Sequence, residues 1–472
     1  MNGKIIAVVV VAVMAVAAVG AGIILANNNN SKDKTDIDSP VLLVYGNANG
    51  DYYLNNSDVS ELKKLVKDQP SDWKEKHPYA DTNCDGSLTD DDVSMLESIL
   101  NATADEKVTI NVVSHALEVP YVSKVRYPVT AAACNSNQTT MATLKTIGID
   151  KEIVSTSVAS SGTNTDGSVK QSNYDKYVFG DYFDVMDSKH QIGAKSAEIA
   201  ADKMTQVVKN YGCTVYFYSA SNGKFANTDE LSKGIDIVQV EDGMSNVAHY
   251  GSAVLLYGFL FGNDDNKYVD KSVEVVNWFL DFSKELKNRL SKVTSGEVTK
   301  VSGVASSMTG YVSIKGSSNT NIIEEAGLYC PLANKNPTSE TSMTMTYNSA
   351  SDTWLNMIDV DTIVVLEGSK SGWSWFDGDY TASKLPSSYK THFDCFNTMK
   401  CYKDGKMVLV STMMCGPQKS GVLAQYYYPD LFEEKWFENK MADFYQKFWG
   451  FESSQTDNLK YILSQSEAIV TA

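Results

Sequence analysis

The chain has 472 residues, of which 43% are hydrophobic, and it carries a formal net charge of −17 at pH 7. Its length allows about three domains with substantial hydrophobic cores. The acidic balance argues against nucleic acid as a partner, because binding to a phosphate backbone needs a basic surface.

The N-terminal segment is apolar. Residues 5–26 contain no charged side chain. About 20 such residues span a bilayer, whereas the apolar part of a signal peptide is nearer 7–15 residues. We therefore predict a transmembrane anchor over residues 1–26, with a cleaved signal peptide as the alternative. Lys4 should stay inside and the bulk of the chain should face outward, beyond a polar linker at residues 27–41.

Residues 42–103 contain an internal repeat. A twelve-residue loop rich in oxygen-bearing side chains begins at Asn47 and again at Asp81, and apolar residues at helical spacing follow each loop. Oxygen ligands at positions one, three, five, seven and twelve, with Gly at six, are typical of a calcium loop. The predicted ligands in the first loop are Asn47, Asn49, Asp51, Tyr53 and Asp58. Those in the second are Asp81, Asn83, Asp85, Ser87 and Asp92.

The two loop–helix units resemble a type I dockerin, the calcium-dependent module that docks onto cohesins. The resemblance implies one or two Ca²⁺ ions, a cohesin-bearing partner, and a module that unfolds on chelation while the later domain stays intact. The first loop departs from the pattern, because Asn47 replaces the leading Asp and Tyr52 occupies the Gly position. Weaker calcium binding and a strained turn are expected there. The helix-start pairs that select partners in dockerins, Asn56-Ser57 and Asp90-Asp91, differ between the repeats.

From Lys107 onward, strand patterns alternate with helical patterns, which indicates an α/β fold with a parallel or mixed sheet. The predicted strands are 108–113, 129–134, 214–218, 235–240, 298–304, 362–366 and 406–410. The predicted helices are 141–147, 198–208, 247–261, 264–290, 321–326 and 436–449. The helix at 264–290 is amphipathic and roughly 40 Å long. We therefore predict two α/β lobes, residues 107–262 and 298–472, joined by one long helix within residues 263–293, after the small all-α calcium-binding domain.

Several short motifs lie in order around this helix. They are Leu117-Glu-Val-Pro, Tyr127-Pro-Val-Thr, Asn137-Gln-Thr-Thr-Met, Asn321-Ile-Ile-Glu-Glu-Ala-Gly, Tyr402-Lys-Asp-Gly-Lys and Phe444-Tyr-Gln-Lys-Phe-Trp-Gly. Together they resemble the solute-binding proteins of ABC importers for ferric siderophores, haem and cobalamin, over about residues 108–451. The resemblance implies a ligand held between the lobes and delivered to an importer permease.

Site residues follow from that resemblance. The candidate ligand-binding residues are Asn135, Ser136, Asn137, Tyr311, Trp373 and Trp375. The candidate importer-docking residues are Glu230, Glu324 and Glu325. Aromatic side chains suit large planar or chelated ligands. Because a helical link bends less than a pair of strands, lobe closure should be small.

Other functions find less support in the sequence. There is no GxSxG, P-loop or HExxH motif, which argues against an enzyme. The five His residues are scattered, so capture of a bare metal ion is disfavoured. Seven cysteines leave at least one unpaired, and Cys395, Cys401 and Cys415 lie close enough in sequence for one local bridge. The alternative to transport is a cell-surface adhesion or scaffold component that uses the dockerin-like module. A metal-cluster oxidoreductase relative is a third hypothesis, against which the lack of clustered Cys ligands argues.

Overall fold

The computed structural model describes residues 39–116, 119–134, 139–156, 209–219, 234–243, 246–262, 267–307, 309–315, 317–335, 344–346, 360–367, 387–412, 414–457 and 459–469. The predicted N-terminal anchor and the helix expected at 198–208 lie outside these ranges. Within them, no helix is long and apolar enough to cross a membrane.

The N-terminal module consists of α2 (Asn56–Asp68), α3 (Trp73–Lys76) and α4 (Asp90–Leu100). Both long helices begin with a capping box, in which Asn55 or Thr89 is the N-cap and the Asp three residues later bonds back to it. Their apolar positions recur at helical spacing and close a small core. That core includes Val59, Leu62, Leu65, Val93 and Leu96.

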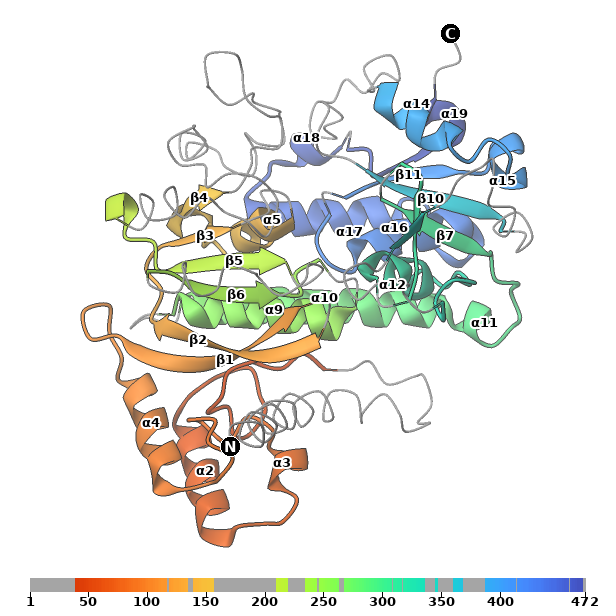
Figure 1. Cartoon of the computed structure of the whole chain (residues 1–472). Coiled ribbons are helices and arrows are strands. Elements are labelled where there is room, and N and C mark those ends of the chain that lie inside the picture. Colours follow the sequence, from red (N-terminus) through yellow and green to blue (C-terminus); the bar gives the residue numbers. More distant parts are fainter. Residues whose placement is uncertain are drawn as a thin grey trace, which may run out of the picture.

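The module is joined directly to the first lobe. The antiparallel hairpin β1 (Val108–Ala116) and β2 (Val119–Tyr127) follows α4. Residues 41–45 run beside β1, where Val44 pairs with Val112 and Tyr45 N–H donates to the carbonyl of Asn111 at 3.0 Å. Figure 1 shows the module beneath this hairpin. Leu42 and Val44 therefore belong to the main core of the protein and not to that of the module.

The first lobe contains a four-stranded parallel sheet. Its order is β4 (Ile153–Thr156), β3 (Ala132–Cys134), β5 (Val215–Ser219) and β6 (Asp236–Val240). The helices are α5 (Thr139–Thr146), the 3₁₀ turn η1 (Asp150–Glu152) and α9 (Val247–Leu260). The hairpin is fixed to this sheet by Arg126, whose backbone N–H and Nε both donate to Asp236 Oδ2, at 2.8 and 2.9 Å.

The second lobe contains a mixed sheet in the order β12 (Ile462–Ser464), β11 (Val408–Ser411), β10 (Thr362–Glu367) and β7 (Gly303–Ser306), with only β12 antiparallel. The small hairpin β8 (Tyr311–Ser313) and β9 (Thr344–Thr346) lies beside it. The helices are α11 (Ser291–Thr294), α12 (Ser318–Glu325), α14 (Ser387–Asp394), α15 (Lys400–Lys403), α16 (Gln418–Tyr427), η5 (Pro429–Leu431), α18 (Ser453–Thr456) and α19 (Gln465–Ala468).

The predicted α/β class is confirmed, although one predicted strand has different bounds. The strand expected at 298–304 is confined to Gly303–Ser306, because only that stretch is buried throughout, between β10 and α12. Cys395, Cys401 and Cys415, which lie close enough in sequence for a local bridge, form no disulfide with one another.

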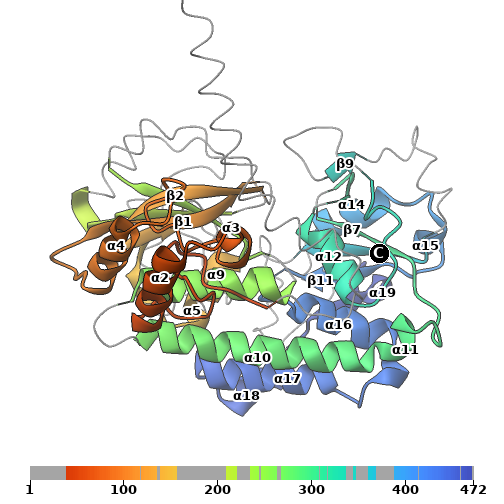
Figure 2. The same cartoon turned by 90° about the horizontal axis from the view of Figure 1, so that it is seen from below.

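Two helices connect the lobes. The predicted long helix is α10 (Lys267–Arg289), and α17 (Trp436–Phe444) lies alongside it (Figure 2). The π-helical segment η6 (Tyr445–Trp449) continues α17 back to the first lobe, where Trp449 Nε1 donates to Thr146 Oγ1 at 3.0 Å. This second connection should restrict lobe movement further than one helix would.

Glu285 on α10 fastens the two helices together. It accepts hydrogen bonds from Trp436 Nε1 at 2.6 Å and Arg289 Nη2 at 2.8 Å, and it pairs with Lys440 Nζ at 2.7 Å. Burial alone would raise the pKa of Glu285, but the bonds from Lys440, Arg289 and Trp436 lower it to about 2. The pKa of this carboxyl is lower in the folded protein than in the unfolded chain, where it is about 4.3. Its contribution to stability is therefore complete at pH values above about 4.3 and is lost as the pH falls toward 2.

We expect Glu285→Gln to lower the free energy of unfolding by about 1 kcal/mol at pH 7, since solvent screens this partly exposed group. The difference from the wild type should shrink at pH 3, where part of the stabilisation has already gone. Urea denaturation at both pH values measures it, with Glu434→Gln, an exposed carboxylate on the segment before α17, as control. An equal loss at both pH values would show that the charge of Glu285 is not what matters.

Candidate functional site

The two loops predicted to bind calcium have the same hydrogen-bond pattern. Asn49 N–H donates to Asp58 Oδ1 at 3.2 Å, and Asn83 N–H donates to Asp92 Oδ1 at 3.1 Å. In both loops the N-cap residue of the following helix donates to the other oxygen of that carboxylate, at 2.9 Å. The repeat seen in the sequence is therefore also a repeat in structure.

The first ligand position of each loop fits a hard cation. Asn47 Nδ2 donates to two backbone carbonyls, and its Oδ1 is buried without a hydrogen-bond partner among the described residues. In the second loop, the carboxylates of Asp81 and Asp92 are both buried. Burial and the nearby charge of Asp92 raise the pKa of Asp81. Oxygens in these two situations are suited to Ca²⁺.

The donor set of these loops is mixed. No group of three or more His, Cys, Asp or Glu side chains in the described ranges has the geometry of a metal site. Calcium loops also draw on amide, hydroxyl and backbone oxygens, as the predicted sets with Asn49, Asn83 and Ser87 do. Calcium binding therefore remains a prediction from the pattern and from the oxygens described above.

The first loop turns differently from the prediction. Gly86, at position six of the second loop, has φ +91°, and its N–H donates to Asp81 Oδ2 at 2.8 Å. Tyr52, its counterpart, does not have a positive φ. Position four is left-handed in both loops, at Gly50 with φ +72° and at Cys84 with φ +60°. The backbone strain expected at Tyr52 is therefore absent. The difference between the loops lies in Asn47, which has no carboxylate to accept the turn's N–H groups.

Most of the predicted ligand-binding residues lie outside the described residues. These are Asn135, Ser136, Asn137, Trp373 and Trp375, together with the docking candidate Glu230. Tyr311 is half-buried at the start of β8, and its carbonyl accepts a hydrogen bond from Ser306 Oγ at the carboxyl end of β7. Glu324 and Glu325 are exposed at the end of α12. Of the candidate ligand-binding residues, the described ranges therefore place Tyr311.

The loops after β6 and β11 meet where the two lobes touch, a region that we call the seam. Asp242 follows β6, and Lys419 lies in the first turn of α16, which follows β11. Both are buried and their charges interact. Burial raises the pKa of Asp242, whose carboxylate accepts a hydrogen bond from Tyr257 at 2.8 Å, and burial lowers the pKa of Lys419. Ligands in open α/β sheets bind beside the carboxyl ends of strands, and here two such ends face each other.

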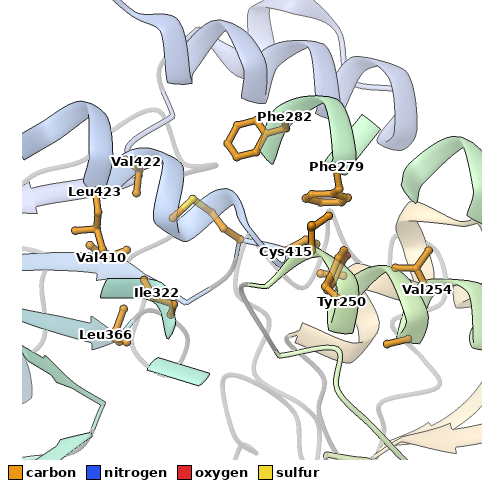
Figure 3. Close-up of a cluster of buried hydrophobic side chains, with 14 of the residues drawn as sticks. Tyr250, Val254, Phe279, Phe282, Ile322, Leu366, Val410, Cys415, Val422 and Leu423 are labelled. Carbon is orange, nitrogen blue, oxygen red and sulfur yellow. The ribbon is translucent and has the colours of Figure 1, made fainter. Parts of the chain in front are cut away.

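The seam is tightly packed. Gly416 passes the ring of Tyr250 so closely that a Cβ there would lie 2.6 Å from it. Figure 3 shows Cys415 beside Phe279 and Tyr250, so apolar side chains continue from one lobe into the other. The lobes therefore share one core at the base of the seam.

Sequence reasoning missed the polar residues of the first lobe that lie near the seam. Glu241 Oε2 accepts from His249 Nδ1 at 2.7 Å and lies 3.6 Å from His115 Nδ1, while Glu241 Oε1 is buried without a hydrogen-bond partner among the described residues. Lys419 was missed as well. No motif marks it, and Ser420 separates it from the apolar run Gly421-Val-Leu-Ala.

Ser306 and His392 form a pair that resembles a nucleophile and a base. Ser306 Oγ lies 2.7 Å from His392 Nε2 and 2.5 Å from the carbonyl oxygen of Tyr311. A hydroxyl has one proton, and the carbonyl can only accept, so Ser306 donates to Tyr311 and accepts from His392. His392 is therefore not poised to activate Ser306, and the pair holds β7, β8 and α14 together.

No protein-family model and no curated protein matches the chain. Among solved structures, it is similar to the molybdate periplasmic binding protein MolA of Haemophilus influenzae, with a TM-score of 0.51 and 14% identity over 72% of this chain and 98% of that one. FepB of Veillonella parvula has a TM-score of 0.48 and 13% identity, covering 75% and 99%. CeuE of Helicobacter pylori has a TM-score of 0.46 and 12% identity, covering 73% and 98%. The chain thus shares the fold of MolA.

Proposed function

We propose that this chain is an extracytoplasmic solute-binding protein. It captures an iron chelate, haem or a cobalamin-type ligand between its lobes and delivers it to an ABC importer permease. The observation that carries the proposal is the seam, where the carboxyl ends of parallel strands from two sheets face each other. The fold is shared with MolA, which is described as the cognate binding protein of an ABC transporter.

The connecting helices, the exposed glutamates and the N-terminal segment each have a role in this proposal. The paired helices α10 and α17 hold the lobes at a fixed spacing, so the solute enters a cleft that closes little. Glu324 and Glu325 at the end of α12 are the docking residues toward the permease, together with Glu230. An N-terminal anchor over residues 1–26 keeps the protein at the outer face of the membrane.

Titration with ferric siderophores, haem and cobalamin tests this function. Tryptophan fluorescence of the purified chain should change saturably with at least one class, with a Kd on the order of 1 μM or below. Absence of binding in all three classes would contradict the proposal.

For the N-terminal module we propose calcium binding and a cohesin-type partner. The repeated loop geometry and the unpartnered Asn47 oxygen support the ion, which would shield the buried carboxylates and hold each loop closed. The exposed helix starts, Asn56-Ser57 and Asp90-Asp91, support a docking role.

We expect the second loop to bind Ca²⁺ more tightly than the first, because it has one more carboxylate. Asp81→Asn should weaken the tighter binding event about tenfold or more, whereas Asn47→Asp should strengthen the weaker event. Calorimetric titration of the metal-free protein measures both changes. Asp105→Asn, an exposed carboxylate outside the loops, is the control. Wild-type affinities in both loop variants would exclude these positions as ligands.

A further inference from the structure

We propose that the first turn of α16 is an anion subsite, which takes a negatively charged oxygen group of the solute such as a carboxylate, a phosphate or a metal oxyanion. The inference deepens the proposed function and rests on it, since the subsite lies at the seam between the lobes. The inference specifies that the solute carries a negative charge.

Three consecutive side chains in this turn are buried donors. Gln418 and Ser420 are 0% exposed and Lys419 is 5% exposed. Gln418 Oε1 accepts from Cys415 N–H at 2.9 Å, but its Nε2 and the hydroxyl of Ser420 have no hydrogen-bond partner in the described parts of the chain. A buried donor without an acceptor costs about 1–3 kcal/mol, so an acceptor is expected at this place.

Lys419 adds a positive charge to the two unpartnered donors. Within the described ranges it has no ion pair inside 4.0 Å, and Asp242 interacts with it from beyond that distance across the seam. The carboxylate of Asp242 is already bonded to Tyr257. The ammonium group therefore has no negative partner within 4.0 Å among the described residues.

The helix end supplies the remaining attraction. α16 has ten residues, and its N-cap, Pro417, offers no side-chain cap. The N-terminus of a helix carries a partial positive charge, which favours an anion. In α16 this charge is the contribution of the backbone, because the N–H groups of Gln418, Ser420 and Gly421 already donate to the carbonyls of Cys415 and Pro417. A neutral solute would leave the amide, hydroxyl and ammonium donors without a charged acceptor. An anionic oxygen group at this helix end would supply Lys419 with a charged acceptor.

A test with inorganic sulfate does not need the solute. The thermal midpoint of the full chain is measured in sodium sulfate and in sodium chloride at equal ionic strength. The wild type and the control Lys292→Gln, an exposed lysine on α11, should show the same sulfate stabilisation, and Lys419→Gln should lose most of it. Ser420→Ala should be as stable as the wild type or more so in chloride, because it removes a buried unpartnered donor, and yet respond less to sulfate. Equal sulfate responses in all four proteins would overturn the subsite, and Ser420→Ala decides the matter if Lys419→Gln does not fold.

A second arm separates the subsite from the proposed function. Anionic ferric citrate should bind the wild type at least about tenfold more tightly than cationic ferrioxamine B, and Lys419→Gln should remove that preference. Binding of both chelates without preference would overturn the subsite and leave the solute-binding function standing. A sulfate response that depends on Lys419, with no binding of any chelate, haem or cobalamin, would overturn the function and leave an anion site.

Discussion

Removal of calcium is expected to loosen the first lobe as well as the N-terminal module. Asn111 in β1 donates from Nδ2 to the carbonyl of Thr82, inside the second calcium loop, at 2.8 Å, and its own carbonyl accepts from Tyr45. Asn111 is buried, so the loss of the loop would leave its amide without a partner. The sequence predicts an independent module, but the structure makes β1 part of its support.

Hydrogen exchange with and without a calcium chelator measures this effect. In chelator, amides of β1 and β2 should exchange at least about tenfold faster, together with those of α2 and α4, because the hairpin then opens locally at a smaller cost in free energy. Amides of β10 and β11, in the second lobe, are the internal control. Full protection of the hairpin while the module exchanges would show that the two are independent.

The second large effect is expected at Gly258, where α9 crosses α10. A Cβ at this position would lie 1.9 Å from Ser272 Oγ and 2.7 Å from the carbonyl oxygen of Tyr268. Gly258→Ala would therefore push α10 away from α9, at a loss of about 3 kcal/mol in the free energy of unfolding. Because α10 joins the lobes, the damage should reach both of them.

Chemical denaturation of Gly258→Ala and of the control Gly243→Ala tests this packing. Gly243 has nothing within 4 Å of the Cβ position, so its substitution should change stability little. Adding Ser272→Ala to Gly258→Ala should restore only part of the loss, since the backbone oxygen of Tyr268 remains. A Gly258→Ala protein as stable as the wild type would mean that the helices cross with more space than the structure has.

Elements with strong local patterns could be predicted from the sequence. The helical spacing of Val269, Val276 and Leu286 defines α10, and the oxygen spacing after Asn47 and Asp81 defines two loops with matching hydrogen bonds. These features depend on residues close together in the chain, where periodicity and turn chemistry determine the structure.

Features formed by distant residues could not be predicted. The bond from Trp449 to Thr146, which makes α17 a second connection, joins residues more than 300 positions apart. The same holds for Asp242 and Lys419, which no motif marks and which only the meeting of two lobes brings together. Such interactions depend on how complete elements pack, and a single sequence contains no local signal for them.

Native mass spectrometry of the chain purified from its own source tests the central claim most directly. The account predicts a population heavier than the polypeptide by the mass of one bound anionic chelate or tetrapyrrole, and denaturation should release that ligand for identification. The mass of the bare polypeptide alone, unchanged after incubation with ferric siderophores, ferric citrate, haem and cobalamin, would contradict a solute-binding function.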